Sequence, residues 1–392
     1  MKYNFDQVYD RNATFATKSY VPNVLLNHPD CSTLWVADMD FEVCKEVVDA
    51  LKERVNHPIF GYTEKTIELK DAVKNWYKRR HNIHYDYDDI VFNTGVVHGY
   101  SAAIRILSNI DDEVIVPVPA YGPFVRKVNA NKRRVITTPL KSFKDNFRID
   151  FDDLENKITD KTKIFVLCNP HNPTGRVYTK EELIEISNFC QKHQLKIISD
   201  EIHCDIIFNH KFNTIIDVSD YARNNTIVLC SIGKTFNLAG LKMGCAIIKN
   251  QTLRKSFLEE SECVGNTSIN CLAEEAYKAA YNYGDAWLDQ CLEYIEKNID
   301  WTIEQFRIQF PELHIFKPEG IYMLWIDLSS FNIQTDDMQK YFFENADTYV
   351  TQGEFFGSEY KNYIRLNMAT QFSNVQIGVE RIIQTLKKRT ID

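Results

Sequence analysis

The stretch TIVLCSIGKTFNLAGLK, residues 226–242, joins an apolar run to a loop that carries two lysines. Its first half has the composition of a β-strand buried on both faces of a sheet. Polar side chains begin where this strand is expected to end, with Ser231 followed by Lys234 and, eight residues later, by Lys242. A lone lysine at such a place is usually a solvated surface residue. A role for these lysines therefore depends on what other segments bring beside them.

Further apolar runs of the same kind alternate with helical patterns along the middle of the chain. They cover residues 112–118, 163–169, 195–200 and 243–249. Between them, the three- and four-residue spacing of Leu69, Val73 and Trp76 predicts one amphipathic helix. Thr179 and Glu182 form a capping-box pattern at the start of another. Strands that alternate with helices predict an α/β fold built on a mainly parallel sheet.

The pattern changes after about residue 280. Residues 286–310 read as one long helix, with Ile295, Ile299, Ile303 and Phe306 on one face. Two strand-like segments follow at residues 320–328 and 363–369. We expect residues 1–45 to form an N-terminal arm and part of a small domain, and residues 46–284 to form the large domain. Residues 285–392, beginning with the long interdomain helix, would complete a smaller α+β domain from both chain ends.

Composition excludes several classes of protein. The 392 residues are 44% hydrophobic and 26% charged, with a net charge of −8, so a nucleic-acid partner is not expected. No apolar run reaches the roughly 18 residues of a membrane span. The first twelve residues lack the apolar core of a signal peptide. The ten cysteines are scattered without a CxxC pair, which favours the reducing cytoplasm.

Metal and dinucleotide sites are not expected. HNIH, residues 81–84, has metal-like spacing but no evident third ligand, and it follows KRR at a helix end, where cationic side chains are common. His203, Cys204 and Asp205 are expected on one strand, whose alternation would turn neighbours to opposite faces and prevent chelation. A GxGxxG motif is absent.

Polar side chains follow each predicted parallel strand. Because the carboxyl ends of parallel strands meet at one edge of a sheet, we expect these side chains to converge. They are Tyr121 after the first strand, Asn172 after the second, Asp200 and His203 after the third, and Ser231 and Lys234 after the fourth.

Pyridoxal 5′-phosphate is the ligand whose chemistry uses this whole set. A lysine forms an imine with an aldehyde. A carboxylate keeps a pyridine nitrogen protonated, an amide donates to a phenolate oxygen, and an aromatic ring lies against a flat heterocycle. On this interpretation Lys234 forms the imine, whereas Ser231 and Lys242 hold the phosphate.

Four motifs then show a family resemblance: NPHNPTG at 169–175, SDEIHCD at 199–205, SIGKTFNLAGLK at 231–242 and YIRLNMA at 363–369. Together they resemble the fold-type I, aspartate-aminotransferase superfamily of pyridoxal-phosphate enzymes. Within it, four segments resemble the MalY/PatB group of cystathionine β-lyases, also called cysteine-S-conjugate β-lyases: LWVADMDF at 34–41, FGYT at 60–63, DEIHCD at 200–205 and GDAWLDQCLEYIEKN at 284–298. The resemblance covers nearly the whole chain.

The resemblance implies a role for each matching residue around the cofactor. Lys234 matches the Schiff-base lysine, Asp200 the partner of the pyridine nitrogen, and Asn172 the donor to the ring oxygen. The residues matching the ring-stacking and phosphate-binding positions are Tyr121, Val96, Val97 and Ser231. The backbone N–H groups of the two valines would face the phosphate at a helix start.

The resemblance also implies substrate contacts and a homodimer. Arg365 matches the arginine that clamps the substrate carboxylate, and Ala37 matches a backbone contact to the same group. Tyr62 matches a tyrosine that reaches the phosphate in the neighbouring subunit. Two positions depart from the pattern, because His203 stands where aminotransferases often have tyrosine and Lys242 where the phosphate cation is commonly arginine. His203 is expected at the cofactor, either donating to the ring oxygen or lying behind the ring.

The implied reaction is β-elimination from cystathionine or another S-substituted L-cysteine, giving a thiol, pyruvate and ammonia. Lys234 would take the Cα proton, and Lys234 or Tyr121 would supply one to the sulfur. Two other functions stay open: an aminotransferase of the same superfamily, and a cofactor-binding regulatory protein that acts by partner contact. Four apolar residues are candidates for the wall of the pocket that holds the thiol part of the substrate: Trp35, Met39, Phe355 and Phe356. Packing between the two domains would explain these residues equally well.

Overall fold

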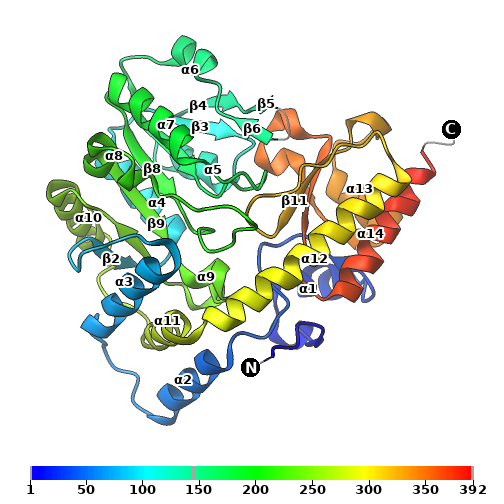
Figure 1. Ribbon diagram of the computed structural model, residues 1–392, viewed down its shortest axis with the longest axis horizontal. Helices are drawn as coiled ribbons and strands as arrows, with labels where there is room; N and C mark the ends of the chain where they lie inside the picture. Colours follow the sequence, from blue (N-terminus) through cyan, green and yellow to red (C-terminus); the bar gives the residue numbers. More distant parts are fainter. Residues whose placement is uncertain (1, 144–145, 390–392) are drawn as a thin grey trace.

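The centre of the molecule is a seven-stranded sheet. The computed structural model describes residues 2–143 and 146–389. The sheet has the order β2-β10-β9-β8-β7-β3-β4, in which β10 alone runs antiparallel to its neighbours. The prediction of an α/β fold with a mainly parallel sheet is therefore confirmed (Figure 1). The strands are β2 (Ile90–Asn93), β3 (Glu113–Val118), β4 (Arg134–Pro139), β7 (Thr162–Cys168), β8 (Lys196–Asp200), β9 (Thr226–Cys230) and β10 (Gly244–Ile247).

Helices cover both faces of this sheet because its strands are apolar on both sides. Alternate residues such as Val114 and Val166 pack on one side against α4 (Val96–Leu107), α5 (Pro123–Ala130) and α10 (Gln251–Cys263). Their strand neighbours, such as Ile115 and Phe165, pack on the other side. That side is covered by α7 (Lys180–Lys192), α11 (Cys271–Tyr283) and α3 (Ile67–His81).

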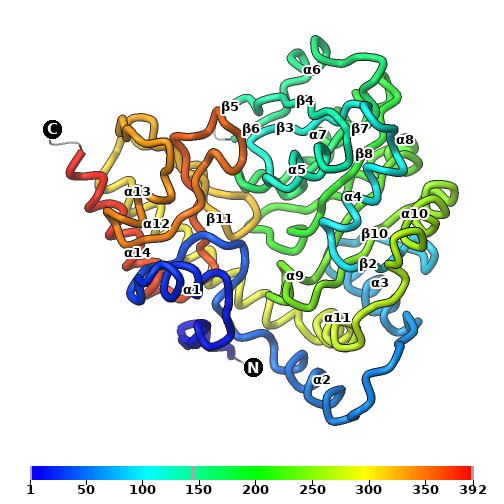
Figure 2. The backbone as a smooth tube through the Cα atoms, turned by 180° about the vertical axis from the view of Figure 1, so that it is seen from behind, coloured from blue at the N-terminus to red at the C-terminus, as the bar shows by residue number. Residues whose placement is uncertain are grey.

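The two ends of the chain meet in a second, smaller unit. The first strand, β1 (Ser32–Thr33), pairs in parallel with β12 (Thr348–Tyr349). Beside them lies a three-stranded sheet of β11 (Met323–Asp327), β14 (Tyr363–Asn367) and β13 (Thr351–Gln352). Figure 2 shows the blue N-terminal segment against the orange and red C-terminal part. The boundaries at residues 45 and 284 stay a prediction.

A long helix joins the two parts. The predicted helix is present as α12 (Asp285–Gln309), which runs from α11 alongside the second unit (Figure 1). Ile295, Ile299 and Phe306 are buried in the core, whereas Ile303 is only partly buried. The capping box of Thr179 and Glu182 is also present, at the start of α7.

The remaining elements surround these layers. Among the described residues, no helix has both the length and the apolar character needed to cross a bilayer. The other helices and strands are α1 (Thr17–Tyr20), α2 (Lys45–Asn56), α6 (Phe151–Lys157), α8 (Asp220–Asn225), α9 (Ile232–Thr235), α13 (Met338–Ala346), α14 (Phe372–Lys387), β5 (Lys141–Phe143) and β6 (Asn146–Arg148). Short helical segments lie at Asn12–Thr14, Val21–Leu25, Ile215–Asp217, Ala239–Leu241, Ser329–Phe331, Gly353–Phe356 and Ser358–Tyr360.

Candidate active site

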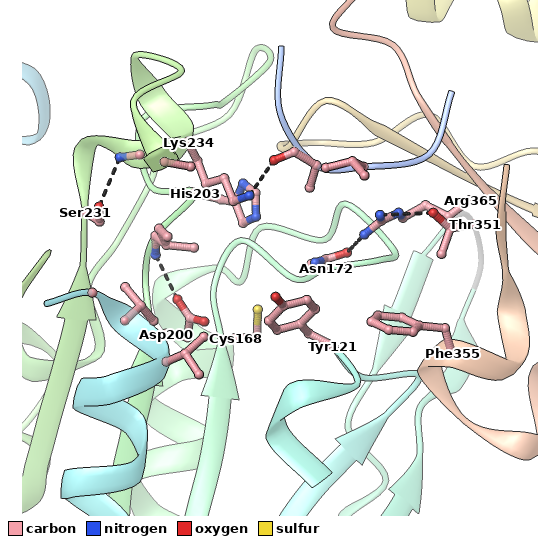
Figure 3. Close-up of a pocket in the computed structure, with 18 of the residues that line it drawn as sticks. Tyr121, Cys168, Asn172, Asp200, His203, Ser231, Lys234, Thr351, Phe355 and Arg365 are labelled. Atoms are coloured by element: carbon pink, nitrogen blue, oxygen red, sulfur yellow. Dashed lines mark hydrogen bonds between the residues drawn. The ribbon is translucent and has the colours of Figure 1, made fainter. Parts of the chain in front are cut away.

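A cavity of about 520 Å³ opens at the carboxyl ends of the parallel strands. Its walls come from the seven-stranded sheet, the N-terminal arm and the C-terminal unit (Figure 3). Eleven of the twelve residues expected at a site line it: Ala37, Val96, Val97, Tyr121, Asn172, Asp200, His203, Ser231, Lys234, Lys242 and Arg365.

Strand register explains why residues distant in sequence meet here. In the parallel ladder Cys168 lies opposite Asp200, and Asp200 lies opposite Leu229. The loops that leave β7, β8 and β9 therefore start at nearly the same level. Each delivers its first polar side chains to the same edge, as the sequence predicted.

Lys234 projects from α9, a helix of a single turn. Ser231 caps this helix, accepting a hydrogen bond from the Gly233 N–H at 3.0 Å. The Lys234 ammonium donates to the Ala37 carbonyl of the N-terminal arm. Burial lowers the pKa of Lys234 to about 8, and the nearby Asp38 carboxylate only partly offsets this effect. A substantial fraction of this amine is therefore neutral, and hence nucleophilic, near pH 8.

Asp200 is a buried carboxylate at the end of β8. Burial raises its pKa to about 7, although the Ile202 N–H donates to it at 3.1 Å and the Lys234 charge favours ionisation. A protonated nitrogen brought beside Asp200 would lower this pKa and keep the carboxylate ionised. Asp200 is thus suited to hold a cationic ring nitrogen.

Arg365 is a buried cation without a carboxylate partner among the described residues. Its guanidinium donates to the Asn172 side-chain oxygen and the Trp35 carbonyl, both at 2.9 Å, and to the Thr351 hydroxyl at 3.3 Å. Burial lowers the pKa of Arg365 to about 10, so it remains charged at neutral pH. A fixed, desolvated guanidinium that lines a cavity is a ready site for a carboxylate.

The bond from Arg365 also orients the amide of Asn172. Because its oxygen accepts from the guanidinium, its NH₂ group is the end that remains available as a donor. Within the described ranges, no hydrogen bond from that NH₂ group is found. Asn172 can therefore donate to an oxygen of a bound molecule.

The uncapped N-terminus of α4 lies at one end of the cavity. Gly95 precedes the helix with φ 126°, and no side chain caps it. The N–H groups of Val96 and Val97 are thus available in the first turn, where the helix dipole favours an anion. Lys242 adds a positive charge to the same cavity. The Ser231 hydroxyl lies here too, but donates to the Met243 carbonyl at 2.7 Å.

Two aromatic rings complete the interior. Tyr121 lies 6.2 Å from Phe355, measured between ring centroids, and burial raises the pKa of its hydroxyl. His203 is buried, and burial together with the charge of Lys234 lowers its pKa, so its ring is neutral at pH 7. Its Nδ1 atom has no hydrogen-bond partner among the described residues. Figure 3 shows His203 beside Lys234 on the far side of the pocket from Phe355.

Comparisons with known proteins identify the family. The model of the aminotransferase class I and II family matches residues 29–382. The chain belongs to the aminotransferase class I and II family. Cystathionine beta-lyase PatB of Bacillus subtilis (strain 168) is 34% identical over 381 residues, which cover 97% of this chain and 98% of PatB.

Solved structures of this family show the same architecture. Cystalysin from Treponema denticola, which contains a pyridoxal 5′-phosphate cofactor, has a TM-score of 0.94 at 30% identity. That alignment covers 99% of this chain and 100% of cystalysin. The PLP-bound C-S lyase from Staphylococcus hominis has a TM-score of 0.91 at 31% identity, with 98% of each chain covered.

Tyr62 is the one expected residue outside the cavity. Its side chain is fully exposed, between α2 and α3. A contribution to this chain's own cavity is therefore not seen, which leaves its expected contact with a neighbouring subunit a prediction.

The sequence missed part of the cavity wall. Trp35 and Phe355 line it as expected, but Met39 and Phe356 are buried in the core instead. Cys168, Gln339, Thr351 and Gln352 also line it and were not expected. Cys168 could have been found as the last residue of a strand that ends at the site. The other three come from the second unit, where no motif indicates them.

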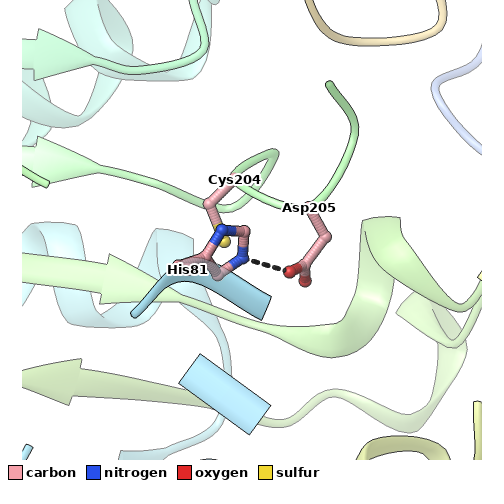
Figure 4. Close-up of side chains that lie close together, drawn as sticks. All are labelled: His81, Cys204 and Asp205. Atoms are coloured by element: carbon pink, nitrogen blue, oxygen red, sulfur yellow. Dashed lines mark hydrogen bonds and ion pairs between the residues drawn. The ribbon is translucent and has the colours of Figure 1, made fainter. Parts of the chain in front are cut away.

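The expectation for His203, Cys204 and Asp205 was wrong. Strand β8 ends at Asp200, and the next five residues form a turn closed by bonds from the Cys204 N–H to Glu201 at 3.0 Å and from the Ile206 N–H to His203 at 2.9 Å. The turn brings Cys204 and Asp205 beside His81, with one potential ligand atom of each within 4.8 Å of the others (Figure 4).

The lowered pKa of Lys234 gives a testable prediction. The rate of its acylation by a small amine-directed reagent in the cofactor-free protein should rise with pH and level off with a midpoint of about 8. The reason is that only the neutral amine reacts, and burial makes this amine neutral more than two units below the ordinary lysine pKa of about 10.4. Peptide mapping by mass spectrometry at each pH measures this midpoint, with surface lysines as the internal reference. A midpoint shared with those lysines would contradict the assignment.

Proposed function

We propose that this protein is a pyridoxal-phosphate-dependent carbon–sulfur β-lyase. Its substrate would be cystathionine or another S-substituted L-cysteine, which takes up water and yields a thiol, pyruvate and ammonia. The observation that carries the proposal is the meeting of Lys234, Asp200 and Arg365 in one cavity of a chain similar along its length to PatB. Similarity to the PLP-bound C-S lyase from Staphylococcus hominis supports the same reaction class.

The residues present fit the cofactor. Lys234 would hold its aldehyde carbon covalently, and Asp200 would pair with its ring nitrogen. The free NH₂ group of Asn172 suits the ring hydroxyl oxygen. The phosphate would lie at the uncapped start of α4, where the N–H groups of Val96 and Val97 are free and Lys242 adds a charge.

The chain's own groups then account for the proton transfers. Bound pyridoxal phosphate supplies an electron sink for the charge left when a bond to the substrate Cα is broken. Arg365 binds the substrate carboxylate and fixes Cα near Lys234. Once the substrate amino group has replaced Lys234 at the cofactor carbon, the Lys234 amine is free, and its low pKa leaves it neutral and able to remove the Cα proton. The Tyr121 hydroxyl, whose raised pKa keeps it protonated, is available to protonate the departing sulfur.

The proposal includes a homodimer with shared sites in the cytoplasm. Support for a dimer comes from the exposed apolar side chains between α2 and α3, since Ile59, Phe60 and Tyr62 are each more than half exposed. A second copy that covered this segment would bury them and carry Tyr62 to its partner's phosphate end. Free thiols at all ten cysteines agree with a reducing compartment.

Product analysis tests the reaction class. Purified protein loaded with pyridoxal phosphate should release pyruvate and thiol from cystathionine in equal amounts. Lys234→Ala should lose nearly all of this activity, whereas Lys255→Ala, which changes an exposed lysine of α10, should keep it. Pyridoxamine phosphate without thiol would instead identify an aminotransferase, and no product from a cofactor-loaded protein would contradict both enzymatic functions.

Substrate affinity tests the carboxylate site. Arg365→Ala should raise KM for the amino-acid substrate by about a hundredfold, because a buried charge-assisted pair is lost, with a smaller change in kcat. Steady-state kinetics measure both constants. The matched control is Arg307→Ala, which removes an exposed arginine of α12 and should leave KM unaltered. An unchanged KM in Arg365→Ala would refute the role of this guanidinium.

A further inference from the structure

One buried carboxylate ties together three segments around Lys234. Asp205, at the end of the turn that follows β8, accepts hydrogen bonds at one oxygen from the Trp76 indole N–H at 2.9 Å and from His81 Nε2 at 2.7 Å. Its other oxygen accepts from the Thr235 hydroxyl at 2.7 Å. The residue is 4% exposed, and these partners hold its pKa below the ordinary aspartate value despite burial. Asp205 is therefore a fixed anion between α3, the turn and α9.

A metal ion does not explain this cluster. The 2.7 Å between His81 Nε2 and the Asp205 oxygen is a direct hydrogen-bond distance, whereas two atoms that bind one zinc ion lie more than 3 Å apart, roughly, at bond lengths of about 2 Å. The thiol of Cys204 is engaged with the Tyr77 hydroxyl at 3.5 Å. The donors thus satisfy one another.

Thr235 directly follows Lys234 and ends α9. A helix of one turn has almost no intrinsic stability, so outside contacts must set its orientation. The first residue of α9 is held by a bond from the Ile232 N–H to the Tyr277 hydroxyl at 3.1 Å. At the other end, the last residue of α9 is held by the hydrogen bond from the Thr235 hydroxyl to the Asp205 carboxylate.

The same carboxylate also terminates the segment that carries Asp200 and His203. Only four residues separate Asp200 from Asp205, and the turn between them is closed by its own backbone bonds. Through Thr235, Asp205 therefore fixes the lysine-bearing helix relative to the turn that directly follows Asp200, the proposed ring-nitrogen partner. The two side chains that must act on the same ligand are held by one shared anchor.

We propose that Asp205 and Thr235 are positioning residues for Lys234. The bond between them sets the direction in which Lys234 enters the cavity, and the Trp76 and His81 donors hold the carboxylate in place. The inference rests on the proposed role of Lys234, but not on which product the enzyme forms. It assigns a use to SDEIHCD beyond its first aspartate, and to the threonine that follows the lysine.

Three variants of the full-length, cofactor-loaded protein test it. Thr235→Val removes the donor while keeping nearly the same shape, and Thr235→Ser restores the donor. Thr302→Val is the matched control, because Thr302 is a fully buried threonine of α12 whose hydroxyl donates to the Asn298 carbonyl at 2.8 Å, outside the cavity. The readouts are the melting temperature, the affinity for pyridoxal phosphate, the pH midpoint of the cofactor's visible absorbance, and kcat and KM.

Thr235→Val should lower kcat about tenfold with KM within about twofold, as expected when a reacting group is misaligned but the substrate site is intact. It should also displace the pH midpoint of the absorbance and weaken cofactor binding, whereas Thr235→Ser should reverse these changes. Thr302→Val should change only the melting temperature. If Thr235→Val matched Thr302→Val in all readouts, Asp205 would be structural only and the inference would be wrong.

The test separates this inference from the proposed function. If the unaltered protein failed to attach pyridoxal phosphate to Lys234, the proposed function itself would fail. If it attached the cofactor and turned over substrate while Thr235→Val behaved normally, only the positioning role would be overturned.

Discussion

The parallel pairing of β7, β8 and β9 is the constraint on which the candidate site depends. Their register places Cys168, Asp200 and Leu229 side by side, so the three loops that follow leave the sheet at a common level. The strands can pair in this way because they are apolar on both faces and are covered by helices on both sides. A carboxylate, an amide and a lysine thereby meet, although more than sixty residues separate Asn172 from Lys234.

Burial then gives these groups their chemical character. It lowers the pKa of Lys234 to about 8 and raises that of Asp200 to about 7, so each is brought toward neutrality in the free protein. Arg365 is different, because a guanidinium keeps its charge when it is desolvated. The cavity thus contains one permanent cation at the proposed carboxylate site and two groups that a cationic ring and an aldehyde could use. This combination suits an anionic, planar ligand better than it suits a metal ion.

Reading the strand ends predicted the fold class and the polar side chains that the strand ends bring to the cavity, because both follow from local patterns: apolar runs, helical spacing and the first polar residues after each run. The roles of Val96, Val97, Arg365 and Ala37 did not follow from such patterns and came from family resemblance. Neither local patterns nor the family resemblance predicted Thr351 and Gln352, since these residues reach the cavity only when the second unit folds against the sheet. Local composition also predicted wrongly that His203–Asp205 would lie on a strand. The strand ends at Asp200, and the following residues form a turn closed by backbone hydrogen bonds.

The same turn contains a residue, Asp205, whose proposed role could not be predicted from the sequence. Asp205 ends the SDEIHCD motif, but no pattern in the sequence assigns its side chain a role, because its partners on α3 and α9 lie more than a hundred and about thirty residues away, respectively. Satisfied, buried polar groups of this kind rigidify a core and specify one arrangement. In this molecule the arrangement concerned is that of the lysine-bearing helix.

The identity of the lysine that binds the cofactor is the most direct test of the account. Borohydride reduction of the protein loaded with pyridoxal phosphate converts the covalent link into a stable secondary amine, which peptide mass spectrometry can locate. The account predicts one modified residue per chain, at Lys234. Modification at Lys242 instead, or labelling spread over surface lysines with Lys234 untouched, would contradict it.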